Sequence, residues 1–299
     1  MNNQPSPAPI SRAGIFLVLF AAAGFAGKTI LAKLAFRYGV DPLTLLTLRM
    51  LIAGVFFAAV LGINVHRGRW QLKLTRKQWI LITLMGIGGY YLSSYLDFAG
   101  LYYVDANLGR MILFLYPTMV VILNSFISRT KFSSSAKISL TICYLGLFLM
   151  MSPNLGRPQR DFLLGSSLIL CSALTYAVYL VGVDHFFKDQ GINFFVSLIF
   201  GVSSAAVFIH FSLLRPLASL RQPSEVYWLV LLMALVSTVL PIYALSAGLA
   251  KIGAPRAATL SMAGPIATLF MGIYILDEKV AGIQILGMFL MILGVSRIK

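Results

Sequence analysis

Residues 247–295 read AGLAKIGAPRAATLSMAGPIATLFMGIYILDEKVAGIQILGMFLMILGV, and they give the most direct indication of the fold class. The segment holds two apolar runs, 254–276 and 281–296, on either side of a charged loop that contains the sequence DEK. A helix that crosses a bilayer needs about 20 predominantly apolar residues, and both runs approach or exceed this length. The segment therefore predicts two membrane-spanning helices joined by a short charged loop.

The same pattern of long apolar runs and short polar segments continues along the whole chain. The runs of transmembrane length, or close to it, cover residues 14–36, 43–63, 79–98, 105–127, 138–153, 163–182, 194–214, 227–247, 254–276 and 281–296. Of 299 residues, 59% are hydrophobic and 11% are charged, whereas a soluble domain carries about 25% charged residues. Apolar runs without strict alternation favour helices over a barrel. The sequence thus predicts an all-α polytopic membrane protein with ten transmembrane helices, of which the fifth and tenth are short.

The basic residues indicate how the chain lies in the membrane. The net charge is +15, and most basic residues stand between the apolar runs, with the highest density in the loop 64–78. If the N-terminus lies inside, the inner segments carry about twice as many Lys and Arg residues as the outer ones, as the positive-inside rule requires. We therefore expect both termini in the cytoplasm.

Other functional classes have no signature in this sequence. Basic residues do not cluster with aromatic residues as in nucleic-acid-binding modules, so no nucleic-acid partner is predicted. Cys143 and Cys171 lie within apolar runs, and neither they nor the three histidines have the spacing of a metal site. HExxH, an intramembrane Asp pair and a Ser-His arrangement are all absent from the sequence. We expect no cofactor, no metal and no enzymatic activity.

The two halves of the chain resemble each other. After a shift of 148 residues, 99–146 aligns with 247–294 without a gap, and the identical positions include Pro117 with Pro265. Each half holds five apolar runs, so the second half enters the membrane from the opposite side, as in the inverted repeats of secondary transporters. The expected division is a cytoplasmic tail and two repeats: 1–13, 14–155 (helices 1–5) and 156–299 (helices 6–10).

The segment quoted above resembles the closing part of an EamA-type repeat of the drug/metabolite transporter superfamily. The resemblance extends over nearly the whole chain as two such repeats. It implies a ten-helix inverted-repeat transporter that exports amino acids or other small metabolites across a bacterial inner (plasma) membrane. The chain departs from the family pattern at Ala23-Gly24, where a Trp-Gly pair is common. The acidic residue at the end of the ninth helix is present as Glu278, whereas its counterpart in the first half is Thr130.

Three cationic residues lie within the apolar runs: Lys28, Arg49 and Arg110. Counted at 1.5 Å per residue from the outer ends of their runs, all three lie roughly 8–9 Å deep. Charge at membrane depth costs a few kcal/mol on insertion scales and tends to mark a transport pathway. Their counterparts in the second repeat are uncharged, so we expect a polar pathway where the symmetry of the repeats is broken.

Two carboxylates, Asp97 and Asp105, share this level or lie just above it. We expect Asp97 to form a salt-bridged outer gate with Arg49 or Arg110, and Asp105 to cap a helix N-terminus. The alternative for Lys28 and Arg49 is snorkelling to the outer headgroups or a purely structural ion pair.

Several tyrosines lie well inside the apolar runs, where their hydroxyl groups could bind a polar substrate and their rings could pack on its apolar part. The residues expected to line the pathway are Tyr91, Tyr95, Tyr116, Tyr176, Tyr179 and Tyr243. An interfacial aromatic belt is the alternative. Pro117 and Pro265 each free a backbone carbonyl and can kink their helices, so they are candidate hinges, with static bends as the alternative.

These observations predict a secondary transporter that works by alternating access in the lipid bilayer. The excess of cations over carboxylates favours export of a small amino-acid-like or other carboxylate-bearing metabolite. Import of a vitamin-like or nucleoside-like compound is the alternative within the same class. A lipid-linked flippase and a membrane-embedded enzyme are the alternatives outside it. The sequence leaves open whether the protein is a monomer or a homodimer.

Overall fold

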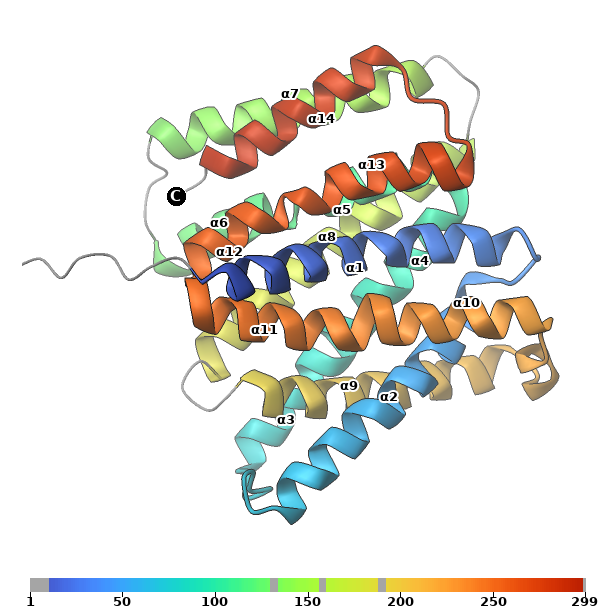
Figure 1. Cartoon of the computed structure of the whole chain (residues 1–299), viewed down its shortest axis with the longest axis vertical. Helices are drawn as coiled ribbons and strands as arrows, with labels where there is room; N and C mark the ends of the chain where they lie inside the picture. Colours follow the sequence, from blue (N-terminus) through green and yellow to red (C-terminus); the bar gives the residue numbers. More distant parts are fainter. Residues whose placement is uncertain (1–10, 130–133, 156–159, 188–191, 298–299) are drawn as a thin grey trace, which may run out of the picture.

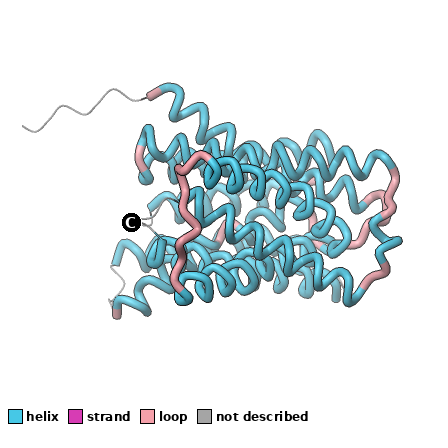
Figure 2. Tube along the Cα trace, turned by 90° about the horizontal axis from the view of Figure 1, so that it is seen from below, coloured by secondary structure: helices cyan, strands magenta, loops and turns pink. Residues whose placement is uncertain are grey.

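The computed structural model describes residues 11–129, 134–155, 160–187 and 192–297. Within these ranges the secondary structure is helical throughout, with short connecting loops and no strand (Figure 2). Most of the expected tail 1–13 and the expected repeat boundary after residue 155 lie outside the described residues.

The helices follow one another along the chain with few residues between them. Their bounds are α1 Arg12–Phe36, α2 Pro42–His66, α3 Arg76–Leu84, η1 Met85–Tyr91, α4 Leu92–Tyr103, α5 Ala106–Leu113, α6 Tyr116–Ser128, α7 Ser134–Leu155, α8 Arg160–Phe187, α9 Ile192–Leu214, η2 Leu217–Leu220, α10 Ser224–Ala234, η3 Leu235–Val239, α11 Leu240–Ile252, α12 Ala254–Ser261, α13 Ala263–Leu276 and α14 Gly282–Arg297.

Among the described residues, eight helical stretches are long and apolar enough to cross a membrane, and two shorter apolar helices, α13 and α14, follow them. This arrangement confirms an all-α polytopic membrane protein. The fifth helix differs from the expectation, because α7 has 22 residues and is not short. Its first turn carries Ser134, Ser135 and Lys137, and these polar residues continue the helix beyond the apolar run. The last helix, α14, has 16 residues, as expected for a short run.

Two three-helix clusters form the centre of the molecule. In the first, named here the α1 cluster, α1 packs against α10–α11 and against α12–α13. In the second, named the α8 cluster, α8 packs against η1–α4 and against α5–α6. Contacts between the two clusters are sparse and involve mainly α1 with α4 and α5, and α13 with α5.

The remaining helices pack in two pairs at opposite edges of the bundle, α7 with α14 and α2 with α9 (Figure 1). The main contacts, which are α7 with α14, α2 with α9, and those of α1 and α8 within their clusters, exchange with one another when each membrane span is replaced by the span five places further along the chain. The exchange also turns the α1 cluster into the α8 cluster. The contacts thus have the pseudo-two-fold arrangement of two inverted five-helix repeats.

Close approaches of glycines preserve this symmetry. A Cβ on Gly100 would lie 2.5 Å from the carbonyl oxygen of Gly165, so α4 and α8 cross with their backbones in contact. A Cβ on Gly248 would lie 3.2 Å from the carbonyl oxygen of Gly14, where α11 crosses α1. A shift of 148 residues aligns Gly100 with Gly248, and a shift of 151 residues, which aligns the first helices of the two halves, places Gly14 on Gly165. Small residues at such crossings allow membrane helices to pack closely.

Helix irregularities also occur at equivalent positions in the two halves. The π-helices η1 and η3 each interrupt the third membrane span of their half, α3–α4 in the first half and α10–α11 in the second. A second interruption falls at Phe114–Leu115 between α5 and α6, and at Met262 between α12 and α13. Pro117 and Pro265 each stand three residues after the start of their interruption, which accounts for the breaks because proline cannot donate the helical hydrogen bond. π-Helical segments and broken helices are frequent at functional sites.

Candidate functional site

A buried ion pair links the two central clusters. The Lys28 Nζ in α1 donates a hydrogen bond of 2.7 Å to the Asp97 Oδ2 in α4. The side chains are only 17% and 8% exposed. This differs from the expected pairing of Asp97 with Arg49 or Arg110, because Lys28 faces α4 directly across the interface of the two clusters. Asp97 is nevertheless in the middle of the cationic group, as the sequence indicated.

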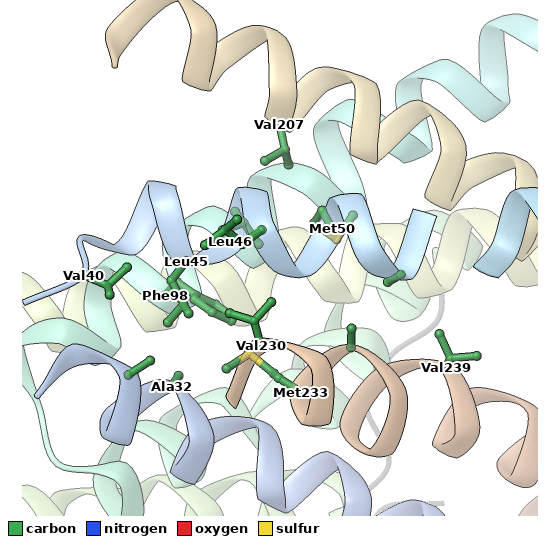
Figure 3. Packing of buried hydrophobic residues seen from close by; sticks show 14 of the residues in the cluster. Ala32, Val40, Leu45, Leu46, Met50, Phe98, Val207, Val230, Met233 and Val239 are labelled. Carbon is green, nitrogen blue, oxygen red and sulfur yellow. The ribbon is translucent and has the colours of Figure 1, made fainter. Parts of the chain in front are cut away.

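Arg49 is fully enclosed in the protein. It is 1% exposed, so snorkelling to the headgroups is excluded for this side chain. Its guanidinium carbon lies 4.9 Å from the centroid of the Phe98 ring, and the Lys28 Nζ lies 5.8 Å from the same centroid. Phe98 packs among Leu45 of α2 and Val230 of α10 (Figure 3). Two cations therefore share one buried aromatic ring, which stabilises them partly by cation–π attraction.

Arg110 completes the group of three cations. It projects from α5 towards α13, where a Cβ on Gly264 would lie 3.2 Å from its Nη2. Tyr116, Tyr176 and Asp97 are its electrostatic neighbours. Within the described ranges, the Nε atoms of Arg49 and Arg110 are buried and have no hydrogen-bond partner. No carboxylate of the described residues lies within 4.0 Å of either guanidinium.

We name Lys28, Arg49, Asp97 and Arg110 the central polar cluster. It contains three cations and one carboxylate, and it lies where the α1 and α8 clusters face each other. An arginine stays charged in proteins, so the excess positive charge persists at any physiological pH. Buried donor atoms without partners, such as the Nε atoms of Arg49 and Arg110, are costly, and an anionic ligand would satisfy them.

A row of aromatic rings adjoins this cluster. Tyr116 and Tyr176 have ring centroids 5.1 Å apart, Tyr176 and Tyr179 5.7 Å, and Tyr179 and Tyr90 5.9 Å. Tyr90 continues the row to Phe200 at 4.3 Å and also interacts with Arg49. Three of the expected tyrosines are thus brought together beside the cations.

The other expected tyrosines lie elsewhere. Tyr91 and Tyr95 turn towards α9, where the Tyr91 hydroxyl is 2.6 Å from the Nδ1 of His210 and the Tyr95 ring is 5.1 Å from the histidine ring. Tyr243 packs against Phe57 at 5.8 Å between ring centroids. In the π-helical turn of η1, Tyr90 rather than its neighbour Tyr91 faces the central polar cluster.

Glu278 has a role that its sequence position did not reveal. Its carboxylate accepts hydrogen bonds from the backbone N–H groups of Ala106 and Asn107 at the start of α5, and from the Asn107 Nδ2 at 2.6 Å. Asp105 occupies the N-cap position of α5, as expected, but its side chain makes no capping hydrogen bond. The capping carboxylate therefore comes from the loop between α13 and α14.

Sequence reasoning missed Tyr90, Phe98 and the capping role of Glu278. Phe98 follows Asp97 directly, and Tyr90 precedes Tyr91. Both residues are therefore adjacent in sequence to a residue that the sequence analysis had selected. Which of two adjacent side chains faces inward depends on the π-helical turn, and the periodicity of an α-helix does not predict it.

Comparisons with known proteins agree with this architecture. The sequence model described as "EamA-like transporter family" matches residues 12–152 and again residues 163–298. The chain belongs to the EamA-like transporter family. This family is part of the drug/metabolite transporter superfamily, so the resemblance of residues 247–295 to an EamA-type repeat is confirmed.

Two relatives come from Bacillus subtilis (strain 168). The "Uncharacterized transporter YcbK" is 31% identical over 288 residues, which cover 92% of this chain and 89% of YcbK. The "Uncharacterized transporter YyaM" is 23% identical over 287 residues, which cover 94% of this chain and 92% of YyaM. The solved structures that match include a crystal structure with a TM-score of 0.68 at 18% identity, which covers 96% of both chains and has the same fold. The protein is thus a multi-pass membrane transporter.

Proposed function

We propose that the protein exports a small carboxylate-bearing metabolite, amino-acid-like in size, across the bacterial inner membrane by alternating access. The observation that carries this proposal is a pair of arginines, the buried Arg49 and the partly buried Arg110, whose Nε atoms are buried and have no partner among the described residues. A guanidinium binds a carboxylate through two parallel N–H···O bonds, and this match is stronger than a neutral hydrogen bond.

The position of the central polar cluster supports alternating access. Its members come from both three-helix clusters, with Lys28 on α1 and Asp97 and Arg110 on α4 and α5. Direct contacts between the α1 and α8 clusters are sparse, so a relative movement of the two clusters would break few of them. A substrate carboxylate bound to Arg110 would lie beside Tyr116 and Tyr176, whose rings can pack on its apolar part.

The direction and the topology are parts of the same proposal. The described chain begins and ends at one end of the bundle (Figure 1). The basic loop 64–78 lies at this end between α2 and α3, which supports a cytoplasmic location for both termini. Export rather than import rests on the family resemblance. The division into repeats at 14–155 and 156–299 is supported by the two family matches and by the exchange of helix contacts described above.

The test uses proteoliposomes that contain only the purified protein. Vesicles are loaded with a mixture of metabolites, and the compounds that leave them are identified by mass spectrometry. Each amino acid is paired with its methyl ester, which has the same side chain but no carboxylate. We expect efflux of one or more carboxylates and not of their esters.

Substitutions at the arginines then separate the site from the function. Arg110→Gln and Arg49→Gln should reduce this efflux at least tenfold, because each removes a charge-assisted partner of the carboxylate. Lys77→Gln is the matched control, since Lys77 is an exposed cation near the start of α3. If efflux persists in both arginine variants, the transport function is supported, but the proposal that Arg49 and Arg110 bind the substrate is wrong. Movement of lipid, or of neutral compounds alone, would favour a flippase or a vitamin- or nucleoside-like substrate.

A further inference from the structure

We propose that Glu278 and Lys33 form the outer gate of the transporter, at the end of the bundle opposite the described chain ends. They would act as positioning residues that hold the α1 and α8 clusters together while the central polar cluster is closed to that side. The term "outer" rests on the proposed function and its topology, whereas the contacts themselves do not.

The contact of Glu278 joins the two clusters at the start of a helix. Glu278 follows α13 of the α1 cluster, and its three donors belong to α5 of the α8 cluster. The first N–H groups of a helix have no partner within the helix, and a carboxylate placed there also interacts favourably with the helix dipole. A Cβ on Gly272 would lie 2.5 Å from the Asn107 Nδ2 and 3.0 Å from the Glu278 Oε2, so this glycine leaves the space in which the contact forms.

Lys33 makes the complementary contact at the end of a helix. Its Nζ on α1 donates a hydrogen bond of 3.1 Å to the carbonyl oxygen of Leu101 in the last turn of α4. A cation at a helix C-terminus satisfies a free carbonyl and interacts favourably with the negative end of the dipole. This contact again joins the α1 cluster to the α8 cluster, one or two turns beyond the Lys28–Asp97 pair.

Arg37 provides an internal comparison. Its Nη2 donates a hydrogen bond of 2.8 Å to the carbonyl oxygen of Leu276 at the end of α13. Like the Lys33 contact, this is a hydrogen bond from a cationic side chain to a carbonyl oxygen at the end of a helix. Here, however, the donor Arg37 and the acceptor Leu276 both belong to the α1 cluster. Separation of the two clusters breaks the contacts of Glu278 and Lys33 and leaves that of Arg37 intact.

The repeat does not supply the same residues at the other end of the bundle. After the shifts that align the halves, the counterpart of Glu278 is Thr130 and that of Lys33 is Asp184. Neither residue has a counterpart of the same type in the other half, so the repeat does not encode this pair of residues twice, as a gate requires when the other end opens at a different stage of the cycle.

The experiment measures access to the central polar cluster from each side without any substrate. A reporter, Ser94→Cys, is introduced into a Cys143→Ser/Cys171→Ser background. Ser94 is 8% exposed, is 3.5 Å from the Arg49 Nη2, and lies roughly 10 Å deeper along α4 than Leu101. The rate of labelling by a membrane-impermeant maleimide is compared in intact cells and in inside-out vesicles.

Glu278→Ala and Lys33→Met should each raise the labelling rate from the side opposite the termini at least tenfold. Arg37→Met should change it less than twofold, since the contact of Arg37 stays within one cluster. If Glu278→Ala impairs folding, Glu278→Gln keeps one acceptor oxygen and should give an intermediate rate.

An unchanged labelling rate in folded Glu278→Ala would overturn the proposed gate, as would an equal increase in Arg37→Met. Labelling does not depend on which substrate is carried. A failure of the carboxylate proposal therefore leaves this result unaffected, and the reverse also holds.

Discussion

The Lys28–Asp97 pair should show an unequal response to the loss of either partner. Asp97→Asn leaves the three cations of the central polar cluster without a carboxylate among the described residues, whereas Lys28→Met leaves Asp97 with Arg110 as an electrostatic neighbour. Breaking a buried pair by removing one partner costs about 3–5 kcal/mol of unfolding free energy. We expect Asp97→Asn to reach this range.

Lys28→Met should cost less, about 1–3 kcal/mol, the range for one buried group that loses a hydrogen-bond partner. Its side chain is 17% exposed, and methionine retains most of its packing. In the double variant both charges of the pair are absent, so its cost should fall short of the sum of the single costs by roughly 0.5–3 kcal/mol.

The assay is reversible denaturant unfolding of the purified protein in mixed micelles, carried out for the four members of the cycle. Arg215 and Asp41 provide the control cycle, because their ion pair is 3.7 Å long and the side chains are 49% and 32% exposed. A pair as exposed as this contributes little, so its coupling should be close to zero. Equal costs for Asp97→Asn and Lys28→Met, or costs that simply add, would refute the reasoning.

Three further predictions concern packing, pH and the helix breaks. Gly100→Ala should destabilise the protein by about 1–3 kcal/mol in the same unfolding assay, because its Cβ would lie 2.5 Å from the Gly165 carbonyl oxygen. Gly62→Ala in α2 is the control: its Cβ would meet nothing within 4 Å, so the substitution should be neutral or stabilising. Burial raises the pKa of the Glu278 carboxyl in the folded protein, so its contribution to stability is complete at acidic pH and is lost as the pH rises through the raised pKa. Thermal unfolding from about pH 4 to pH 7 should show this loss in the parent protein and not in Glu278→Gln. If Pro117 and Pro265 are hinges, Pro265→Ala should slow transport without changing substrate affinity, whereas a static bend predicts a change in stability with an unaltered transport rate.

The helical, membrane-spanning fold was predictable from the sequence because bilayer thickness fixes the length of an apolar helix. Composition alone excluded a soluble domain, and Pro117 and Pro265 marked the positions where α5–α6 and α12–α13 break. The extent of α7 was not predictable from its apolar run, since polar residues such as Ser134 extend a helix into the interface without contributing to hydropathy.

The candidate site was predictable in composition but not in pairing. Depth estimates at 1.5 Å per residue placed Lys28, Arg49 and Arg110 at one level, and the structure brings them around Asp97 and Phe98. Depth does not reveal direction around a helix axis, so it could not indicate that Lys28 rather than Arg49 pairs with Asp97. The inward position of Tyr90 depends on η1, whose wider turn shifts the face of α3–α4 that meets the cluster.

The two repeats contribute different chemistry to a symmetric frame. The contacts between helices exchange between the halves, and so do the glycine crossings and the helix breaks, because close packing in lipid depends mainly on small residues and shape. The charges do not exchange: the three buried cations and Asp97 all belong to the first half, and the capping carboxylate of Glu278 belongs to the second. If the two repeats also carried the same charges, the two ends of the bundle would have equivalent gates, and the substrate would be expected to bind on the pseudo-two-fold axis. Since the charges are confined to one half each, the proposed binding site lies off the pseudo-two-fold axis, and among the described residues the charged side chains of Lys33 and Glu278 join the α1 and α8 clusters at helix ends at the end of the bundle opposite the described chain ends.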